Sequence, residues 1–206
     1  MEQKPLIKIA VIGPESTGKS TLCQLLALHY NTQWCPEFAR EYLLTHGMDY
    51  TYDDLLYIAK GQLALEDEYV QSIVGSSESG VNRSKQHAEL RTLNSELKTP
   101  AFNLLFIDTD MYVMKVWCEF VFGKCHDWIL EQIVKRNYDL YLLCNTDLPW
   151  VKDELREYPD LTTRDKLYRI YKDMMINQST PWVDISGDHN ERTQKAIKAV
   201  DQLVVG

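Results

Sequence analysis

The chain has 206 residues, of which 45% are hydrophobic and 25% charged, so we expect a single globular domain over residues 1–206. The net charge of −8 argues against a nucleic-acid partner, because nucleic-acid phosphates favour a basic surface. No apolar run approaches the length of a membrane span and no secretory leader is recognisable, so we expect a cytoplasmic protein without a membrane partner.

Strand-like and helix-like segments alternate along the chain. Short apolar runs predict five strands, at Leu6–Ile12, Thr32–Cys35, Leu104–Asp108, Leu140–Cys144 and Trp182–Ile185. Apolar residues at helical spacing predict helices at Ser20–Leu28, Tyr52–Val74, Met111–Val121, His126–Arg136, Thr163–Ile176 and Glu191–Val204. This alternation predicts a three-layer α/β fold, in which a central parallel sheet of about five strands carries helices on both faces.

The segment 75–100 interrupts this pattern, because it is polar and has almost no apolar periodicity. A structureless loop of this length is uncommon inside a compact domain. We interpret it as a mobile surface insertion with a short helix near residues 87–97. A partner-binding or lid element is the alternative interpretation.

Residues 13–20 read Gly-Pro-Glu-Ser-Thr-Gly-Lys-Ser and match the pattern G-x-x-x-x-G-K-S/T without a gap. A predicted strand precedes this loop and a predicted helix follows it, as a phosphate-binding P-loop requires. We expect Lys19 to reach the β- and γ-phosphates of ATP and the Ser20 hydroxyl to bind Mg²⁺. The predicted nucleotide-binding residues are Gly13, Glu15, Ser16, Thr17, Gly18, Lys19, Ser20 and Thr21.

The predicted strand Leu104–Asp108 ends in carboxylates. In P-loop enzymes, an acidic residue at the end of a strand beside the P-loop strand holds Mg²⁺ directly or through water. We therefore expect Asp108 to be a metal ligand, while Asp110, two residues further on, is free to face a substrate. A plain strand end or a helix cap is the alternative for such a run.

The third candidate segment, Pro36-Glu37-Phe38-Ala39-Arg40-Glu41, follows the second predicted strand. Ligands of open α/β sheets bind beyond the carboxyl ends of the strands. We therefore expect Glu37, Arg40 and Glu41 to reach the same crevice as Lys19 and Asp108, where Glu37 would act as the base for a hydroxyl acceptor. The start of a solvated helix is the alternative.

The fourth candidate segment covers residues 147–165 and follows the fourth predicted strand. Arginines from a mobile flap often stabilise the charge that develops during phosphoryl transfer. Arg156 and Arg164 are the candidates, with Arg169 behind them. Ordinary exposed helix charge is the alternative for each of them.

Together these segments resemble the ribosylnicotinamide kinase domain of the bacterial NAD-biosynthesis regulators. The resemblance rests on the P-loop and on five further segments: Glu37-Phe38-Ala39-Arg40-Glu41, Gly61-Gln62, Phe106-Ile107-Asp108-Thr109-Asp110, Gly123-Lys124-Cys125-His126 and Asp147-Leu148-Pro149-Trp150-Val151-Lys152-Asp153. It covers nearly the whole chain apart from the segment 75–100. The pairing of Glu-Phe-Ala-Arg-Glu with Ile-Asp-Thr-Asp is its most specific part.

The resemblance implies a P-loop kinase fold and the ATP-dependent phosphorylation of the 5′-hydroxyl of nicotinamide riboside, with Mg²⁺ as the metal. The positive pyridinium ring of this nucleoside suits aromatic walls, which Trp34, Tyr57, Trp117 or Trp150 would supply. In this interpretation Asp110 holds the ribose and Arg40 fixes its position near the phosphates. The predicted substrate-binding residues are Glu37, Arg40, Glu41, Gln62, Asp110 and Trp117.

Other functions are compatible with parts of the sequence. A regulatory GTPase is excluded, because the Asn-Lys-x-Asp and Asp-x-x-Gly motifs that it needs are missing after the fourth and third predicted strands. An ATP-driven binding or assembly protein would keep the P-loop without needing carboxylates in the acceptor crevice. A kinase for another nucleoside or a vitamin alcohol is the closest alternative. The sequence leaves open the acceptor, the choice of base and the oligomeric state.

Overall fold

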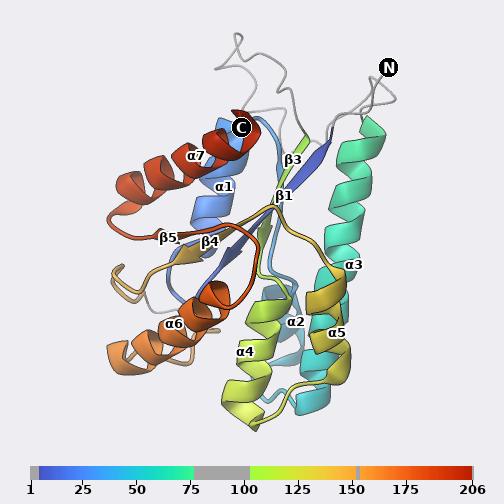
Figure 1. Cartoon of the computed structure of the whole chain (residues 1–206). Coiled ribbons are helices and arrows are strands. Elements are labelled where there is room, and N and C mark those ends of the chain that lie inside the picture. Colours follow the sequence, from blue (N-terminus) through green and yellow to red (C-terminus); the bar gives the residue numbers. More distant parts are fainter. Residues whose placement is uncertain (1–4, 77–102, 152–153, 206) are drawn as a thin grey trace.

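The structure is a computed structural model that describes residues 5–76, 103–151 and 154–205. In chain order its elements are β1 (Leu6–Ile12), α1 (Lys19–His29), β2 (Gln33–Cys35), α2 (Phe38–His46), α3 (Tyr52–Ser76), β3 (Asn103–Asp108), α4 (Met111–Phe122), α5 (Asp127–Lys135), β4 (Leu140–Cys144), α6 (Leu161–Ile176), β5 (Trp182–Ile185) and α7 (His189–Val205). The five strands form one parallel sheet in the order β2-β3-β1-β4-β5 (Figure 1). The predicted fold class is therefore confirmed.

Helices cover both faces of this sheet (Figure 1). On β1, Ile9 and Val11 point toward α1 and α7, whereas Ala10 and Ile12 point toward α3, α4 and α6. All four of these side chains are fully buried. Because successive strand residues face opposite sides, a strand buried on both faces must be apolar throughout. This explains the unbroken apolar run before the P-loop.

A third apolar cluster lies outside the two faces of the sheet. It joins Ala39 of α2, Ile58 of α3, Met114 of α4 and Ile129 of α5. The helix α2 was not among the predicted helices, and the sequence suggested it only as the alternative for Glu37–Glu41. Its buried stripe consists of only Ala39 and Leu43, which is too short for a clear helical period.

The predicted boundaries of the other elements agree with the structure to within a few residues. The helix α3 continues through Ser76, two residues into the segment expected to be an insertion, and the rest of that segment, with its predicted short helix, lies outside the described residues. Among the described helices, none combines the length and the hydropathy that a membrane span requires.

The carboxyl ends of β1 and β3 meet at the same edge of the sheet. The register pairs Val11 of β1 with Asp108 of β3, and Ile12 of β1 with Leu143 of β4. The P-loop after β1 and the carboxylate at the end of β3 are therefore neighbours, although they are far apart in the sequence. β2 lies on the other side of β3, so the segment that begins at Pro36 reaches the same edge.

Gly61 provides a test of the packing between α2 and α3. A Cβ at Gly61 would lie 2.3 Å from the Phe38 ring, whereas a Cβ at Gly75, on the same helix, would have no atom within 4 Å. We expect Gly61→Ala to lower the free energy of unfolding by about 1–3 kcal/mol through overpacking. Gly75→Ala, the matched control, should leave it unchanged or raise it by up to about 1 kcal/mol. Urea unfolding measures both values, and equal effects would contradict the role of Phe38.

Candidate active site

The P-loop is held tightly against the end of β4. Gly13 has a φ angle of +136°, and a Cβ there would lie 2.7 Å from the carbonyl oxygen of Cys144. Gly18, with φ at +79°, caps the N-terminus of α1 in a left-handed conformation. Ser16 also has a positive φ, of 56°. These conformations let the loop wrap around an anion at the positive end of α1.

Side chains of the loop also bond to its own backbone. The Thr17 hydroxyl donates to the carbonyl oxygen of Pro14 at 2.8 Å, and the Lys19 ammonium donates to the same oxygen at 3.1 Å. Both residues line the cavity next to the loop. Lys19 thus lies across the loop, where its charge can meet phosphate oxygens.

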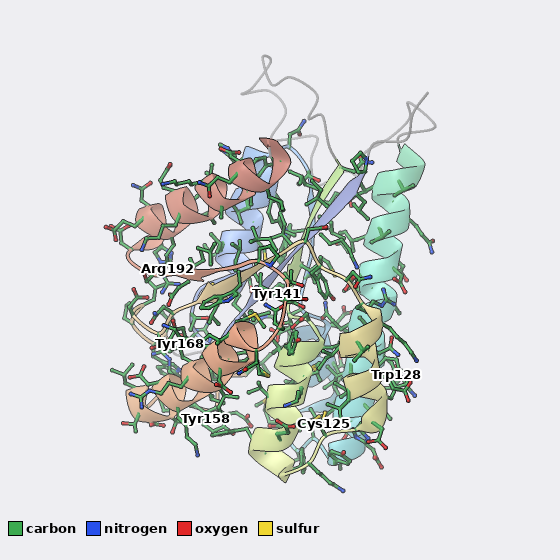
Figure 2. The ribbon with its side chains drawn as sticks, viewed as in Figure 1. Cys125, Trp128, Tyr141, Tyr158, Tyr168 and Arg192 are labelled. Carbon is green, nitrogen blue, oxygen red and sulfur yellow. The ribbon has the colours of Figure 1, made fainter. Side chains whose placement is uncertain are left out.

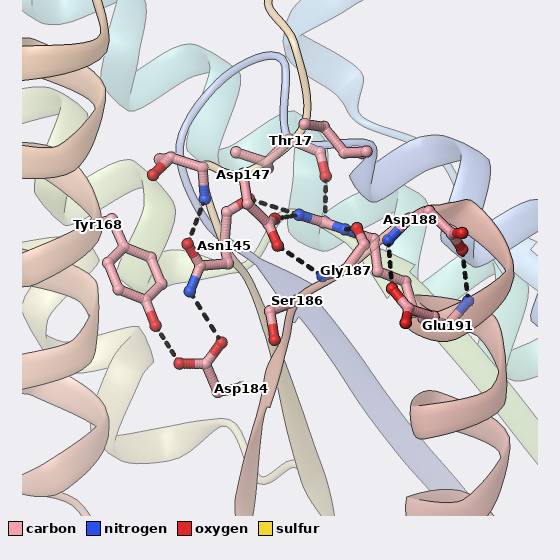
Figure 3. A network of polar contacts seen from close by, with 12 residues as sticks. Thr17, Asn145, Asp147, Tyr168, Asp184, Ser186, Gly187, Asp188 and Glu191 are labelled. Carbon is pink, nitrogen blue, oxygen red and sulfur yellow. Dashed lines mark hydrogen bonds and ion pairs between the residues drawn. The ribbon is translucent and has the colours of Figure 1, made fainter.

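A buried arginine from the last helix supports the loop from behind. Arg192 of α7 is only 3% exposed, and its guanidinium donates to the carbonyl oxygens of Thr17 at 2.9 Å, Asn145 at 2.8 Å and Gly187 at 2.8 Å. It also forms an ion pair with Asp147, whose second oxygen accepts the Gly187 N–H (Figure 3). Buried carbonyl groups need such donors, so Arg192 fixes the loop relative to β4 and β5. Figure 2 labels Arg192 near the first turn of α7.

The sequence analysis missed Arg192, although a signal was available. Arg192 lies four residues before Ala196 and eight before Val200, and both of these are fully buried. An arginine that continues the buried face of a helix has to find partners inside the protein.

The two predicted flap arginines take different positions. Arg156 lines the cavity and donates to the Ser16 hydroxyl at 3.0 Å. Arg164 of α6 is 2% exposed, does not line the cavity, and donates to the carbonyl oxygens of Ser16, Thr146 and Leu148 at 3.1–3.4 Å. Burial lowers the pKa of Arg164. Arg164 is therefore a second support for the loop on the side away from the cavity, whereas Arg156 faces the cavity.

Ser20 and Asp108 form the predicted metal pair. The Ser20 hydroxyl donates to Asp108 Oδ2 at 2.5 Å, and Asp108 Oδ1 is buried without a hydrogen-bond partner in the described structure. Burial, followed by the nearby Glu37 carboxylate, raises the pKa of Asp108 to about 6. A cation bound at Asp108 would give Oδ1 a partner and would stabilise the buried carboxylate charge. A hydroxyl oxygen beside a carboxylate is a ligand set that suits Mg²⁺.

The described residues contain no group of three or more His, Cys, Asp or Glu residues that could hold a metal ion. A Mg²⁺ ion at Ser20 and Asp108 would therefore complete its shell with water and phosphate oxygens, as it usually does in P-loop enzymes. Ser20 and Asp108 therefore fit a Mg²⁺ ion whose remaining ligands come from water and from a bound nucleotide.

Glu37 lies at the turn between β2 and α2 and faces the same cavity. Gln62 of α3 bonds to the residues on either side of Glu37. Its side chain accepts a hydrogen bond from the Phe38 N–H at 2.7 Å and donates one to the Pro36 carbonyl oxygen at 3.2 Å. The Thr109 hydroxyl donates to Glu37 Oε1 at 3.3 Å. Gln62 is 1% exposed and does not line the cavity, so it positions Glu37 from behind.

Thr109 has a strained backbone at this point. Its φ angle is +78°, which is rare for a β-branched residue, and its N–H bonds to the Val11 carbonyl oxygen at 3.2 Å. Such strain costs about 1–3 kcal/mol and tends to occur at functional sites. Here it places a hydroxyl between Asp108 and Glu37.

The P-loop, Asp108, Glu37 and Arg156 border one cavity of about 470 Å³. Its lining combines polar side chains, among them Lys19, Asp108 and Glu37, with apolar and aromatic ones, among them Trp117 and Phe120. The predicted site residues that line it are Gly13, Glu15, Ser16, Thr17, Gly18, Lys19, Ser20, Thr21, Glu37, Arg40, Asp108, Trp117 and Arg156. Gln62, Glu41, Asp110 and Arg164 do not line it.

Two expectations about the acceptor side differ from the structure. Asp110 is 1% exposed and is not free to face a substrate, because it caps α4 through the N–H groups of Tyr112 and Val113 and accepts the Tyr141 hydroxyl at 3.1 Å. Burial raises the pKa of Asp110 to about 7. Glu41 is exposed and lies about 200° around α2 from the cavity-lining Ala39, so it points away from the crevice.

Comparison with known proteins identifies the family. A family model described as an AAA domain matches residues 8–192, which is most of the chain. The chain belongs to the AAA domain family. This AAA domain is also similar to the trifunctional NAD biosynthesis/regulator protein NadR of Escherichia coli strain K12, with 23% identity, and of Salmonella typhimurium, with 25% identity. Each match covers 98% of the chain but only 44% of the relative, so the chain spans less than half their length.

Solved structures share the fold of this AAA domain. A crystal structure of NadR protein in complex with NR has a TM-score of 0.70 at 22% identity, covering 96% of this chain and 49% of that chain. Thymidylate kinase from Ehrlichia chaffeensis has a TM-score of 0.59 at 13% identity, covering 95% of this chain and 99% of that chain. The P-loop kinase fold and the resemblance predicted from the sequence are thereby confirmed.

The Arg192 network provides a stability test of the AAA domain. Arg192→Ala would leave three carbonyl groups and Asp147 without their donor, and we expect the free energy of unfolding to fall by about 3 kcal/mol. Lys198→Ala, at an exposed position of the same helix, should change it by less than about 0.5 kcal/mol. Chemical denaturation compares the two variants, and similar small effects would contradict the supporting role of Arg192.

Proposed function

We propose that this AAA domain is an ATP-dependent kinase that phosphorylates the 5′-hydroxyl of nicotinamide riboside to give nicotinamide mononucleotide. One observation carries the proposal: a single cavity is lined by the P-loop, the Ser20–Asp108 pair and Glu37 together with apolar and aromatic side chains. An ATPase without a small-molecule acceptor would have no use for a carboxylate and an aromatic pocket beyond the phosphate site.

The proposed nucleotide end of the cavity uses the P-loop and the cations around it. Loop N–H groups and the start of α1 would hold the β-phosphate, while Lys19 and Arg156 would lie against the transferred phosphoryl group. Arg156 belongs to the predicted lid-like segment 147–165, whose movement stays a prediction. Mg²⁺ held by Ser20 and Asp108 would neutralise the phosphate charge that builds up during transfer.

The proposed acceptor end places a base at the mouth of the apolar pocket. Glu37 would accept the hydrogen bond of the 5′-hydroxyl and take up its proton late in the reaction, since the transition state is loose. Arg40 lines the cavity on the same side and would orient the acceptor near the phosphates. Asp110 would act indirectly, because its oxygens fix the start of α4 and thereby the wall that carries Trp117.

The comparisons support the proposal at the level of its chemistry. One similar NadR structure was solved in complex with NR, and another in complex with NAD and AMP-PNP, with a TM-score of 0.64 at 19% identity. The first agrees with a nucleoside acceptor in the apolar pocket, and the second with an ATP-like molecule on the P-loop.

A panel of acceptors tests the proposed substrate. With ATP and Mg²⁺, nicotinamide riboside should give the highest kcat/KM among nicotinamide riboside, uridine, adenosine, thymidine and an uncharged vitamin alcohol, because its ring alone is positively charged. Chromatography of the phosphorylated product measures the rate with each acceptor.

Lys19→Ala should abolish turnover with every acceptor, since no other loop residue supplies that charge. A better uncharged acceptor would reassign the substrate, and ATP hydrolysis independent of any acceptor would overturn the kinase proposal.

Glu37→Gln tests the proposed base. The amide keeps the size of the side chain but cannot accept the proton, so kcat should fall by about 10²–10⁴-fold while ATP binding persists. Glu41→Gln is the matched control on the exposed face of α2 and should change kcat by less than about twofold. Steady-state kinetics and calorimetric nucleotide titration provide the two readouts. A kcat for Glu37→Gln close to that of the unmodified protein would remove Glu37 as the base.

A further inference from the structure

A carboxylate within the segment 147–165 that the sequence analysis did not single out lines the cavity. Glu157 lines the cavity together with Trp117, and the two are joined through Tyr50. The Trp117 indole N–H donates to the Tyr50 hydroxyl oxygen at 2.9 Å, and the Tyr50 hydroxyl donates to Glu157 Oε2 at 2.9 Å. An indole N–H can only donate, so the direction of this chain is fixed and the carboxylate is its final acceptor.

The backbone around Glu157 is fixed as well. The N–H groups of Glu157 and Tyr158 donate to the two carboxylate oxygens of Glu15, at 2.9 and 2.5 Å. The Tyr158 ring packs edge-on against Phe120 of α4, with 5.4 Å between ring centroids. In Figure 2, Tyr158 is labelled next to α6. Glu157 is thus held by the P-loop on one side and by the Tyr50–Trp117 pair on the other.

Glu157 is itself exposed, and the cavity that it borders is lined in part by apolar side chains. Leu43, Met48, Val116 and Phe120 are among these lining residues. Partial burial, opposed by the hydrogen bond from Tyr50, raises the pKa of Glu157, and the Glu15 charge adds to this effect. A cation bound in this cavity would be attracted to the Glu157 carboxylate, and the attraction would grow as the bound molecule displaces water from between the two charges.

We propose that Glu157 is a specificity-determining residue, which selects acceptor nucleosides whose base carries a positive charge. This inference rests on the proposed function, because it assigns the apolar pocket to the base of the acceptor. Trp117 supplies an aromatic group next to the ring, Glu157 supplies the opposite charge, and Tyr50 links the two. A neutral ring of the same shape would have the aromatic contacts but not the attraction of the carboxylate.

A purely structural role for Glu157 predicts something different. If the carboxylate only fixed its own segment through Tyr50, then its charge would be unimportant and every acceptor would depend on it equally. Glu157→Gln separates the two roles, because the amide oxygen can still accept the Tyr50 hydrogen bond but carries no charge. Glu154→Gln, at an exposed position of the same segment, controls for a general loss of negative charge.

The experiment compares nicotinamide riboside with its reduced form, which has the same ribose and carboxamide but an uncharged ring. We expect Glu157→Gln to lower kcat/KM for nicotinamide riboside about tenfold, mainly through KM, and to leave the value for the reduced form within about twofold. Glu154→Gln should leave both values within about twofold. Equal losses for the two ring forms, or no loss for either, would overturn the proposal.

Equilibrium binding distinguishes a failure of this inference from a failure of the proposed function. Calorimetric titration of both ring forms without ATP gives the ratio of their dissociation constants in the absence of turnover. A charge preference that disappears in Glu157→Gln would support the inference even if the protein phosphorylated neither ring form. Phosphorylation of nicotinamide riboside with an unchanged binding ratio in Glu157→Gln would support the proposed function and refute the inference.

Discussion

The architecture of this site depends on one requirement, that the carbonyl groups of the P-loop find donors. A loop that turns its N–H groups toward a bound anion turns carbonyl groups toward the protein, where water cannot reach them. Arg192 donates a hydrogen bond to the carbonyl oxygen of Thr17, and Arg164 donates one to that of Ser16. Lys19 donates to the carbonyl oxygen of Pro14. The first two donors come from α7 and α6, so the shape of the loop depends on helices near the other end of the chain.

Residues outside the cavity also fix the position of Glu37, as they fix the P-loop. Glu37 borders the cavity, but the groups that place it, Gln62 and Thr109, bond to its neighbours and to its carboxylate. The requirement for glycine at position 61 has the same origin, since only a residue without a Cβ lets Phe38 lie against α3. If Glu37 is the base, as proposed, a carboxylate held in this way would need little reorganisation when an acceptor binds.

The two halves of the cavity are physically connected. Glu15 of the P-loop holds the backbone of Glu157, and Glu157 in turn bonds through Tyr50 to Trp117 in the apolar pocket. Three hydrogen bonds therefore connect Trp117 to the P-loop. Relatives that share this fold at low identity can differ in such contacts, because the fold alone fixes only the positions of the strands and helices.

The sequence by itself determined the parallel sheet, the P-loop and the pairing of Ser20 with Asp108, because these follow from apolar runs and from a motif of fixed spacing. Only the tertiary structure decided which polar residues face the cavity. It turned Asp110 into a helix cap, moved Arg164 behind the loop and brought Glu157 to the apolar pocket. The physical reason is that a side chain's role depends on partners from distant segments, and the sequence pattern records only local periodicity.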